Sequence, residues 1–371
     1  MSFYESATVM TKLYCKLQDD ISKGLFWSRL KYETKSDMDS LLDLIASSHT
    51  VNPKAIQRVK HFRSVFSHIE SINGRIVLYG AGTYGILYAE NLIRSGRDFY
   101  CFCDKNHAGE KLIGKDVISP EQLIDRRDDF YVFITAKHSY EEIKNMLLSH
   151  GMQPNHIVED CGILTNLRDD IPRMYFEFEN LIPLNGAFID AGCYDGDDSL
   201  YFRKNLKRGG DIFAFEPDAI NYRRCVKKIK EGNVDNIKLL DKALGDNQEE
   251  GFLEAFGGTG SYLSSCNPEN DSINRRKPSQ KQKVAVVRLD EEVDCNIGMI
   301  KMDIEGAEFD ALHGAEKIIS RDKPFLAISV YHRKGDMLSI MEYINSIVPE
   351  YNFWLRHYTA TDNDTVLYAS V

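Results

Sequence analysis

Residues 186–216 constrain the fold more than any other stretch, because they read as one strand, loop, helix and strand. A small apolar run over 187–189 ends in Asp190, and two glycines, Gly192 and Gly196, allow a sharp turn into a helix expected over 199–207. The next strand, 212–215, ends at Glu216, 24 residues after Gly192. An acid there can accept hydrogen bonds from both hydroxyls of a ribose. The stretch therefore predicts a nucleoside site in a doubly wound α/β sheet.

The charge of this loop narrows the choice of nucleoside. It carries four carboxylates, at Asp190, Asp195, Asp197 and Asp198. These would repel a pyrophosphate, which needs uncharged backbone amides at a helix N-terminus. S-adenosylmethionine has a sulfonium, an ammonium and no phosphate, so the loop favours it as the cofactor. The alternative is an ordinary doubly wound repeat whose loop happens to be acidic.

Composition excludes several classes of protein. With 371 residues the chain is long enough for two domains and a smaller piece, and its net charge of −10 argues against a nucleic-acid partner. The eight cysteines are scattered without a paired CxxC arrangement, so we expect reduced core residues. No run of 18 apolar residues indicates a membrane span, and no signal peptide is apparent in the first 20 residues. We therefore expect a cytoplasmic protein.

Residues 1–72 are expected to form a helical N-terminal segment. Leu41, Leu42, Leu44 and Ile45 fall on one side of a turn, and apolar residues spaced by three and four predict a second helix over 56–69. So many apolar positions must be covered, either by the domain that follows or by a second copy of the chain. A homo-oligomer is one expectation from this pattern.

Residues 73–160 contain a second glycine loop. A strand over 75–79 enters a GxGxxG motif made by Gly80, Gly82 and Gly85, and a strand over 99–103 ends in Asp104, 24 residues after Gly80. A strand over 131–135 and a helix over 140–150 complete a compact Rossmann-like domain. This loop is uncharged, so a phosphate can be accommodated at the helix N-terminus. The alternative is a domain without a ligand, whose glycines only allow the helix to approach the strand.

Four segments of this domain, 80–85, 104–106, 114–120 and 131–136, resemble the small nucleotide-binding domain found ahead of sugar acyltransferases and some sugar-modifying methyltransferases. The resemblance implies that the domain holds a sugar nucleotide or a related group. A second nucleotide site is thus expected at Gly80, Gly82, Gly85 and Asp104.

A linker is expected over 161–185, where Asp169, Asp170 and Pro172 interrupt the pattern, and a further domain is expected over 186–371. Strands are expected over 187–190, 212–215, 237–240, 299–303 and 325–330, followed by two strands, 352–357 and 365–369, that have no helix between them. The last pair predicts an antiparallel hairpin. Residues 251–290 form a long polar insertion, which is typical of a lid. A solvated loop without a partner is the alternative.

Three ionisable residues alternate where the strand over 299–303 leaves the sheet. Lys301, Asp303 and Glu305 can share a side, at the edge where ligands of open α/β sheets bind. A carboxylate with a raised pKa there could take a proton from a hydroxyl during methyl transfer, and His332, at the end of another strand, is the second candidate base. Alternatively, Lys301 and Asp303 form an ion pair. Asp303 and Glu305 are hard oxygen donors, but two carboxylates on one strand do not define a site, so no metal is predicted.

Together, residues 188–199, 216–217, 243–245, 301–308, 312–315 and 329–332 resemble the FkbM-type methyltransferases over about 180–371. The resemblance implies a class I methyltransferase sheet and transfer of a methyl group from S-adenosylmethionine to an oxygen, usually of a sugar, glycan precursor or related natural product. One departure is Cys193-Tyr194, where the family usually has a small residue and Asn.

The sequence thus predicts an α/β protein with two doubly wound Rossmann-like domains. The expected catalytic residues are Asp303, His332, Lys301 and Glu305. The expected donor-binding residues are Asp190, Gly192, Cys193, Tyr194, Asp195, Gly196, Glu216, Pro217, Lys242 and Ala243. Two other functions stay open: a dinucleotide-dependent oxidoreductase that uses Gly80, Gly82, Gly85 and Asp104, and a non-catalytic assembly protein whose helical N-terminus binds a partner.

Overall fold

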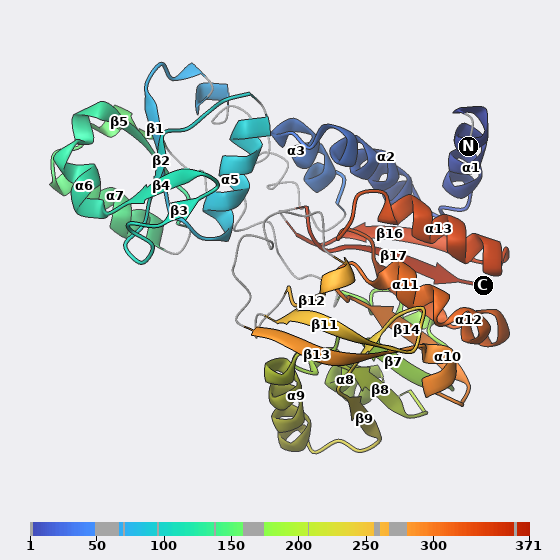
Figure 1. The fold of residues 1–371 in the computed structure, drawn as a ribbon. Coiled ribbons are helices and arrows are strands. Elements are labelled where there is room, and N and C mark those ends of the chain that lie inside the picture. The colour runs from blue at the N-terminus through green and yellow to red at the C-terminus, as the bar shows by residue number, and fades with distance from the viewer. Residues whose placement is uncertain are drawn as a thin grey trace. The chain divides into compact units, whose positions relative to one another are not determined.

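The computed structural model describes residues 3–48, 67–69, 71–94, 96–136, 139–158, 174–206, 208–255, 260–266, 280–359 and 362–371 (Figure 1). The chain divides into two compact units. The seven-stranded unit comprises residues 1–26, 171–358 and 363–371, and the six-stranded unit comprises residues 27–170 and 359–362. Each is described by itself below.

The six-stranded unit is built on a mainly parallel sheet with the strand order β3-β4-β2-β1-β5-β6. Only the short β3 runs antiparallel, to β4. The strands are β1 (Arg75–Tyr79), β2 (Cys101–Cys103), β3 (Lys111–Leu112), β4 (Lys115–Ile118), β5 (Phe130–Ile134) and β6 (Ile157–Val158). The helices are α3 (Met38–Ala46), α5 (Thr83–Arg94), α6 (Pro120–Asp125) and α7 (Tyr140–Ser149). Val77, Cys103 and Val132 of the strands and Leu147 of α7 are among the residues that form its core, as expected where helices cover a parallel sheet.

The seven-stranded unit has the strand order β16-β17-β15-β14-β7-β8-β9. Its strands are β7 (Ala187–Ala191), β8 (Ile212–Phe215), β9 (Ile237–Leu240), β14 (Ile297–Met302), β15 (Phe325–Ser329), β16 (Asn352–His357) and β17 (Thr365–Ser370). The expected antiparallel hairpin is present, since β17 pairs antiparallel with both β15 and β16. All the other pairings in this sheet are parallel. The carboxyl ends of β7, β8 and β14 therefore meet at one edge.

Helices connect these strands. They are α8 (Asp197–Tyr201), which continues as a wider turn over Phe202–Leu206, α9 (Ala219–Gly232), α10 (Leu289–Glu292), α11 (Glu308–His313), α12 (Glu316–Asp322) and α13 (Asp336–Ile347). In Figure 1, α11, α12 and α13 gather on one side of the strands, and α12 contacts β14. The helix expected over 199–207 thus begins two residues earlier, at Asp197.

The insertion over 251–290 differs from the loop that its polarity indicates. It contributes most of a four-stranded sheet with the order β10-β13-β11-β12, made by β10 (Lys242–Leu244), β11 (Glu249–Ala255), β12 (Tyr262–Leu263) and β13 (Gln280–Val287). Burial alternates along the second half of β13, where Val284 and Val286 are buried and Lys283 and Ala285 are exposed, as in a strand with one face on the core. Residues 256–259 and 267–279 lie outside the described residues.

Part of the predicted linker over 161–185 belongs to the core instead. Tyr175, Phe176 and Ile182 are buried against β7 and β17 residues. Their irregular spacing produces neither the helical nor the strand period, so the sequence pattern could not reveal them. Residues 159–173 lie outside the described residues.

The N-terminal residues also depart from the expected helical segment over 1–72. Residues 1–26, including α1 (Phe3–Cys15) and the start of α2 (Asp20–Lys35), belong to the seven-stranded unit, where Leu17 pairs with Phe353 of β16. Leu41, Leu42, Leu44 and Ile45 of α3 are fully buried, as their pattern predicts. The helix expected over 56–69 falls mostly outside the described residues. Within the described part of the chain, no helix has the length and apolar content needed to cross a membrane.

Candidate functional site

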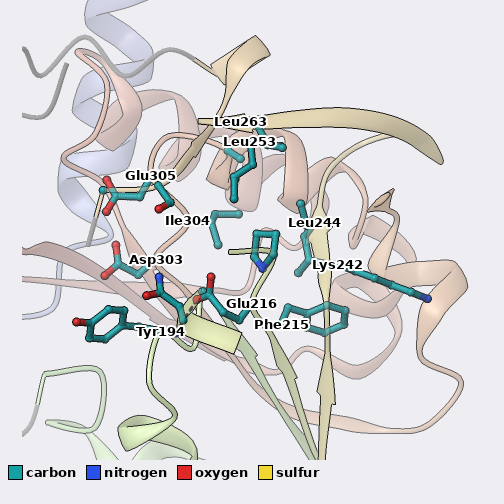
Figure 2. A pocket seen from close by; sticks show the side chains of 17 residues that line it. Tyr194, Phe215, Glu216, Lys242, Leu244, Leu253, Leu263, Asp303, Ile304 and Glu305 are labelled. Atoms are coloured by element: carbon teal, nitrogen blue, oxygen red, sulfur yellow. Dashed lines mark hydrogen bonds between the residues drawn. The ribbon is translucent and has the colours of Figure 1, made fainter. Parts of the chain in front are cut away.

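A cavity of about 680 Å³, including space open to solvent, lies at the carboxyl edge of the seven-stranded sheet (Figure 2). Residues that follow β7, β8 and β14 form its floor, and the insertion sheet forms its apolar wall through Leu244, Leu253 and Leu263. Several residues that the sequence singles out line it: Gly192, Tyr194, Glu216, Pro217, Lys242, Ala243, Asp303 and Glu305. The sequence thus located the edge of the sheet at which the cavity lies.

Glu216 is the buried acid of this cavity. Its Oε2 accepts a hydrogen bond from the backbone N–H of Tyr194, and its Oε1 accepts one from that of Asp218, both at 2.9 Å. Burial raises the pKa of Glu216 to about 7, although these two hydrogen bonds oppose the shift. Both oxygens keep a free lone pair for further donors. Glu216 is therefore placed to receive two hydroxyls of a ligand.

The acidic residues of the loop after β7 do not line the cavity. Asp195 and Asp197 both pair with Lys228 of α9, at 2.6 and 2.8 Å. Asp190 is fully buried and accepts a hydrogen bond from Ser199 Oγ at 2.6 Å. These carboxylates are thus paired within the protein, with Lys228 shared by Asp195 and Asp197, and they are not the acids that face the cavity. The carboxylates that line the cavity are Glu216, Asp303 and Glu305.

The other loop residues shape the turn. A Cβ on Gly192 would lie 1.9 Å from the carbonyl oxygen of Asp303, so only glycine permits this approach of β7 to β14. Gly196 has φ +84° at the start of α8 and faces Cys225, whose Sγ lies 3.7 Å from Cys193 Sγ. Cys193 is buried away from the cavity. Tyr194, which departs from the family pattern, adopts φ +51° and lines the cavity.

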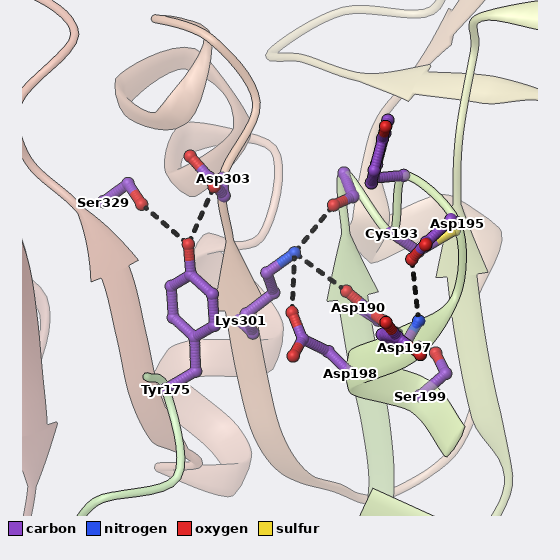
Figure 3. A network of polar contacts seen from close by, with 12 residues as sticks. Tyr175, Asp190, Cys193, Asp195, Asp197, Asp198, Ser199, Lys301, Asp303 and Ser329 are labelled. Carbon is purple, nitrogen blue, oxygen red and sulfur yellow. Dashed lines mark hydrogen bonds and ion pairs between the residues drawn. The ribbon is translucent and has the colours of Figure 1, made fainter. Parts of the chain in front are cut away.

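Lys301 is structural rather than catalytic in position. It is a register partner of Asp190 on the neighbouring strand, and its Nζ lies 3.0 Å from Asp190 Oδ1 and donates to Gly192 O at 2.7 Å (Figure 3). Burial lowers its pKa, but the charges of Asp190 and Asp198 outweigh burial and raise it. Lys301 therefore stays charged, pairs with Asp190 instead of Asp303, and braces the loop after β7 through Gly192. It does not line the cavity.

Asp303 follows β14 and has a quarter of its side chain exposed. Its Oδ2 accepts a hydrogen bond from Tyr175 Oη at 2.7 Å, and its Oδ1 lies 3.3 Å from Tyr331 Oη. Burial acts to raise its pKa, but the charges of His332 and Lys301 and the Tyr175 hydrogen bond lower it below the ordinary value. The expectation of a carboxylate with a raised pKa at this position is therefore wrong.

His332 lies among carboxylates. Its Nε2 is 3.3 Å from Glu305 Oε2, and its Nδ1 is 2.9 Å from Glu308 Oε1. Burial lowers its pKa, but Glu308 and Glu305 raise it well above the ordinary value. This shift favours the imidazolium, which has no ring lone pair left to accept a proton, and so opposes the role of second base that its position suggested. His332 instead holds the acidic residues in place.

The same residues have the spacing of a cation site, since ligand atoms of Asp303, Glu308 and His332 lie within 4.8 Å of one another. Glu308 Oε1, however, already accepts the backbone N–H of Ile304 at 2.8 Å and lies 2.9 Å from His332 Nδ1, and Oε2 accepts the N–H of Gly306 at 3.0 Å. These contacts describe an ion-pair network that fixes the loop after β14. We assign no metal to it.

Residues 190–355 match the methyltransferase FkbM domain. The chain carries an FkbM methyltransferase domain. The 2-O-methyltransferase NoeI of Sinorhizobium fredii (strain NBRC 101917 / NGR234) is 24% identical over 152 residues, covering 37% of this chain. That similarity spans only about 60% of the relative's length. The crystal structure of methyltransferase FkbM from Methylobacillus flagellatus KT covers 92% of this chain and 100% of its own, with a TM-score of 0.51 and 21% identity, and it shares the fold.

The FkbM domain contains site residues that the sequence reading missed. Leu253 and Leu263 line the cavity but lie in a stretch expected to be a polar lid. Glu308, which pairs with His332, lies in the 301–308 motif, which assigns it no role. Ser261 of the insertion donates to Asp218 Oδ2 at 2.7 Å, which joins the insertion to the Glu216 loop. For Glu308, the signal was a third carboxylate five residues after Asp303. No sequence signal indicated Tyr175, which lies before the FkbM domain.

The glycine loop of the six-stranded unit is closed on itself. A Cβ on Gly85 would lie 1.9 Å from Gly80 O, and Asp104 Oδ2 accepts the backbone N–H of Ala81 at 2.9 Å. Thr135 Oγ1 donates to Gly80 O at 3.1 Å. These contacts account for Gly80, Gly85 and Asp104 through packing, whereas Gly82 faces open space. Nucleotide binding by this loop stays a prediction.

Proposed function

We propose that this protein is an S-adenosylmethionine-dependent O-methyltransferase that acts on a hydroxyl of a sugar, a glycan precursor or a related natural product. The observation that carries the proposal is the shared cavity, in which buried Glu216 after β8 and Asp303 after β14 both contribute carboxylates. The FkbM domain supports the reaction class, and the relative named a 2-O-methyltransferase supports oxygen as the acceptor atom.

The donor would be bound by three features of the cavity. Glu216 would accept the two ribose hydroxyls. Ala243 is small, and the apolar wall made by Leu244, Leu253 and Leu263 offers a flat region for adenine to pack against. The carboxylates of Glu216, Asp303 and Glu305 would favour the positive charges of the donor. When bound, the donor supplies the methyl group; the protein supplies its orientation.

For the acceptor, Asp303 is the side chain placed to interact with the hydroxyl. Its lowered pKa makes it a weak base, so it would accept the proton late, once the oxygen has begun to bond to the methyl group and has become more acidic. Alignment of the two substrates would then contribute much of the rate. Asp303 would thus receive the proton that the acceptor hydroxyl loses when it is methylated.

Titration calorimetry of the purified protein with S-adenosylmethionine tests the donor assignment. We expect binding by the wild type and by Glu249→Gln, an exposed acid on β11, and weakened binding by Glu216→Gln. Mass spectrometry of acceptors incubated with isotopically labelled donor then identifies the hydroxyl. If the wild type does not bind the donor while a control methyltransferase does, the proposal fails.

A further inference from the structure

Tyr175 lies 15 residues before the FkbM domain, in the chain that enters β7. It is 2% exposed, although it belongs to a segment with no regular secondary structure. Its φ of +74° falls in the left-handed region, which a bulky aromatic residue rarely adopts. Such a conformation persists only where the surroundings enforce it, and it points to a functional constraint.

The contacts of Tyr175 show what enforces this conformation (Figure 3). Its backbone N–H donates to Tyr368 Oη at 3.1 Å, which anchors the main chain to β17. Its side chain enters the site, where Oη donates to Asp303 Oδ2 at 2.7 Å and lies 3.4 Å from Ser329 Oγ. Lys301 Nζ lies over the ring, 5.1 Å from its centroid. One residue thus touches both the acid that faces the cavity and the lysine that braces the loop after β7.

We propose that Tyr175 is a positioning residue for methyl transfer, whose hydroxyl fixes the Asp303 carboxylate so that Oδ1 is presented to the acceptor. The proposal rests on the function proposed above. The other groups near Oδ1, Tyr331 Oη at 3.3 Å and His332 Nε2 at 3.4 Å, are more distant than Tyr175 Oη is from Oδ2. The Tyr175 contact with Asp303 is therefore shorter than those of Tyr331 and His332.

Two physical effects follow from this contact. A short hydrogen bond removes rotational freedom from the carboxylate, so the acceptor meets it in one orientation. The bond also stabilises the ionised form, which keeps Asp303 deprotonated to lower pH. The charged and titratable groups that share this environment are Lys301, His332, Tyr331, Glu305, Asp198 and Asp364. All of them remain when only the Tyr175 hydroxyl is removed.

Tyr175→Phe tests the proposal, because it keeps the ring beneath Lys301 and removes only the hydroxyl. The matched control is Tyr351→Phe, which removes another buried phenol, whose Oη donates to the carbonyl of Pro324 at 2.6 Å. We expect Tyr175→Phe to bind S-adenosylmethionine within about twofold of the wild type and to lower kcat about tenfold with the acceptor identified above. The acid limb of its pH profile should move up by about 0.5–1 unit. Tyr351→Phe should change neither kcat nor the profile.

A readout without an acceptor separates this proposal from the proposed function. In protein labelled with ¹³C at the aspartate carboxyl carbons, the Asp303 resonance, assigned with Asp303→Asn, should titrate at higher pH in Tyr175→Phe. An unchanged titration and kcat, with a loss of thermal stability like that of Tyr351→Phe, would show a merely structural role and overturn the inference. Failure of the wild type to bind the donor would instead refute the proposed function.

Discussion

The two glycine loops of this chain are nearly the same in local construction, yet only one of them borders the cavity described here. In each, the acid that ends the second strand accepts two backbone N–H groups, one from the loop and one from two residues further along its own chain. Glu216 accepts those of Tyr194 and Asp218, and Asp104 accepts those of Ala81 and Asn106. The glycines and the acid therefore indicate a local loop conformation, and they do not by themselves indicate a binding site.

The difference lies on the neighbouring strand. β5 and β14 occupy the same place beside the two loops, and the next residue is Thr135 in one case and Asp303 in the other. Thr135 Oγ1 turns back and donates to Gly80 O, which fills the space beside the loop. Asp303 contacts the Gly192 turn through its backbone and leaves its carboxylate at the cavity. The two loops therefore differ in the residue after the adjacent strand: Thr135 fills the space beside one loop, whereas Asp303 leaves the cavity beside the other open.

Asp303→Asn should give the largest effect, the loss of measurable turnover, because the substituted amide cannot accept the proton of the hydroxyl. Thr135→Ser, the matched change beside the other loop, keeps the hydroxyl and should leave turnover unchanged. Single-turnover transfer from labelled donor measures both. Full activity in Asp303→Asn would leave alignment of the substrates as the main source of catalysis.

Glu216→Gln and Asp104→Asn compare the two acids directly. We expect the first to weaken donor binding about 10- to 100-fold, because hydrogen bonds to a charged group contribute about 1.5–3 kcal/mol. The second should leave donor affinity within about twofold. Calorimetry with S-adenosylmethionine measures both. Equal losses would show that the six-stranded loop takes part in donor binding.

Donor affinity should depend on pH through Glu216. With a pKa of about 7, the Glu216 side chain is mostly protonated at pH 6 when no donor is bound. The ribose hydroxyls, however, donate hydrogen bonds to the ionised carboxylate. Binding should therefore tighten about tenfold between pH 6 and pH 8 and then level off, with release of a proton on the acidic side. Calorimetry in buffers of different ionisation enthalpy counts that proton. Glu216→Gln should show no such dependence, and a flat wild-type profile would contradict the assignment.

Gly85→Ala should give the smallest effect, a loss of about 1–3 kcal/mol in the stability of the six-stranded unit with donor affinity unchanged, because its Cβ would meet Gly80 O. Gly82→Ala is the matched control, since a Cβ there meets open space. Denaturant unfolding measures both. If Gly82→Ala instead abolishes the binding of a sugar nucleotide, tested with uridine diphosphate glucose, the glycine loop of the six-stranded unit is a ligand site.

The sequence revealed features that depend on local pattern. Apolar runs that end in polar residues located β8, β9 and β15, and the absence of a helix between the last two strands predicted the β16–β17 hairpin. Ion-pair partners that lie far apart in the sequence could not be predicted from local pattern. Nothing in the loop after β7 indicates that Lys228 neutralises Asp195 and Asp197, or that His332 would be charged by Glu305 and Glu308. Of the carboxylates that the sequence singled out, Glu216, Asp303 and Glu305 line the cavity, whereas Asp190 and Asp195 do not.

The order of strands in the seven-stranded sheet bears on where this protein can be cut. β17 lies between β15 and β16, although it comes last in the chain, and residues 16–18 bond to Phe353 on the outer side of β16. A fragment limited to the matched residues 190–355 would lose β17 and bare the pairing edge of β15. Unpaired edges of this kind recruit other chains, so we expect such a fragment to aggregate. The residues that match the family, 190–355, are therefore not the residues that form the compact unit, which also includes 1–26 and 363–371.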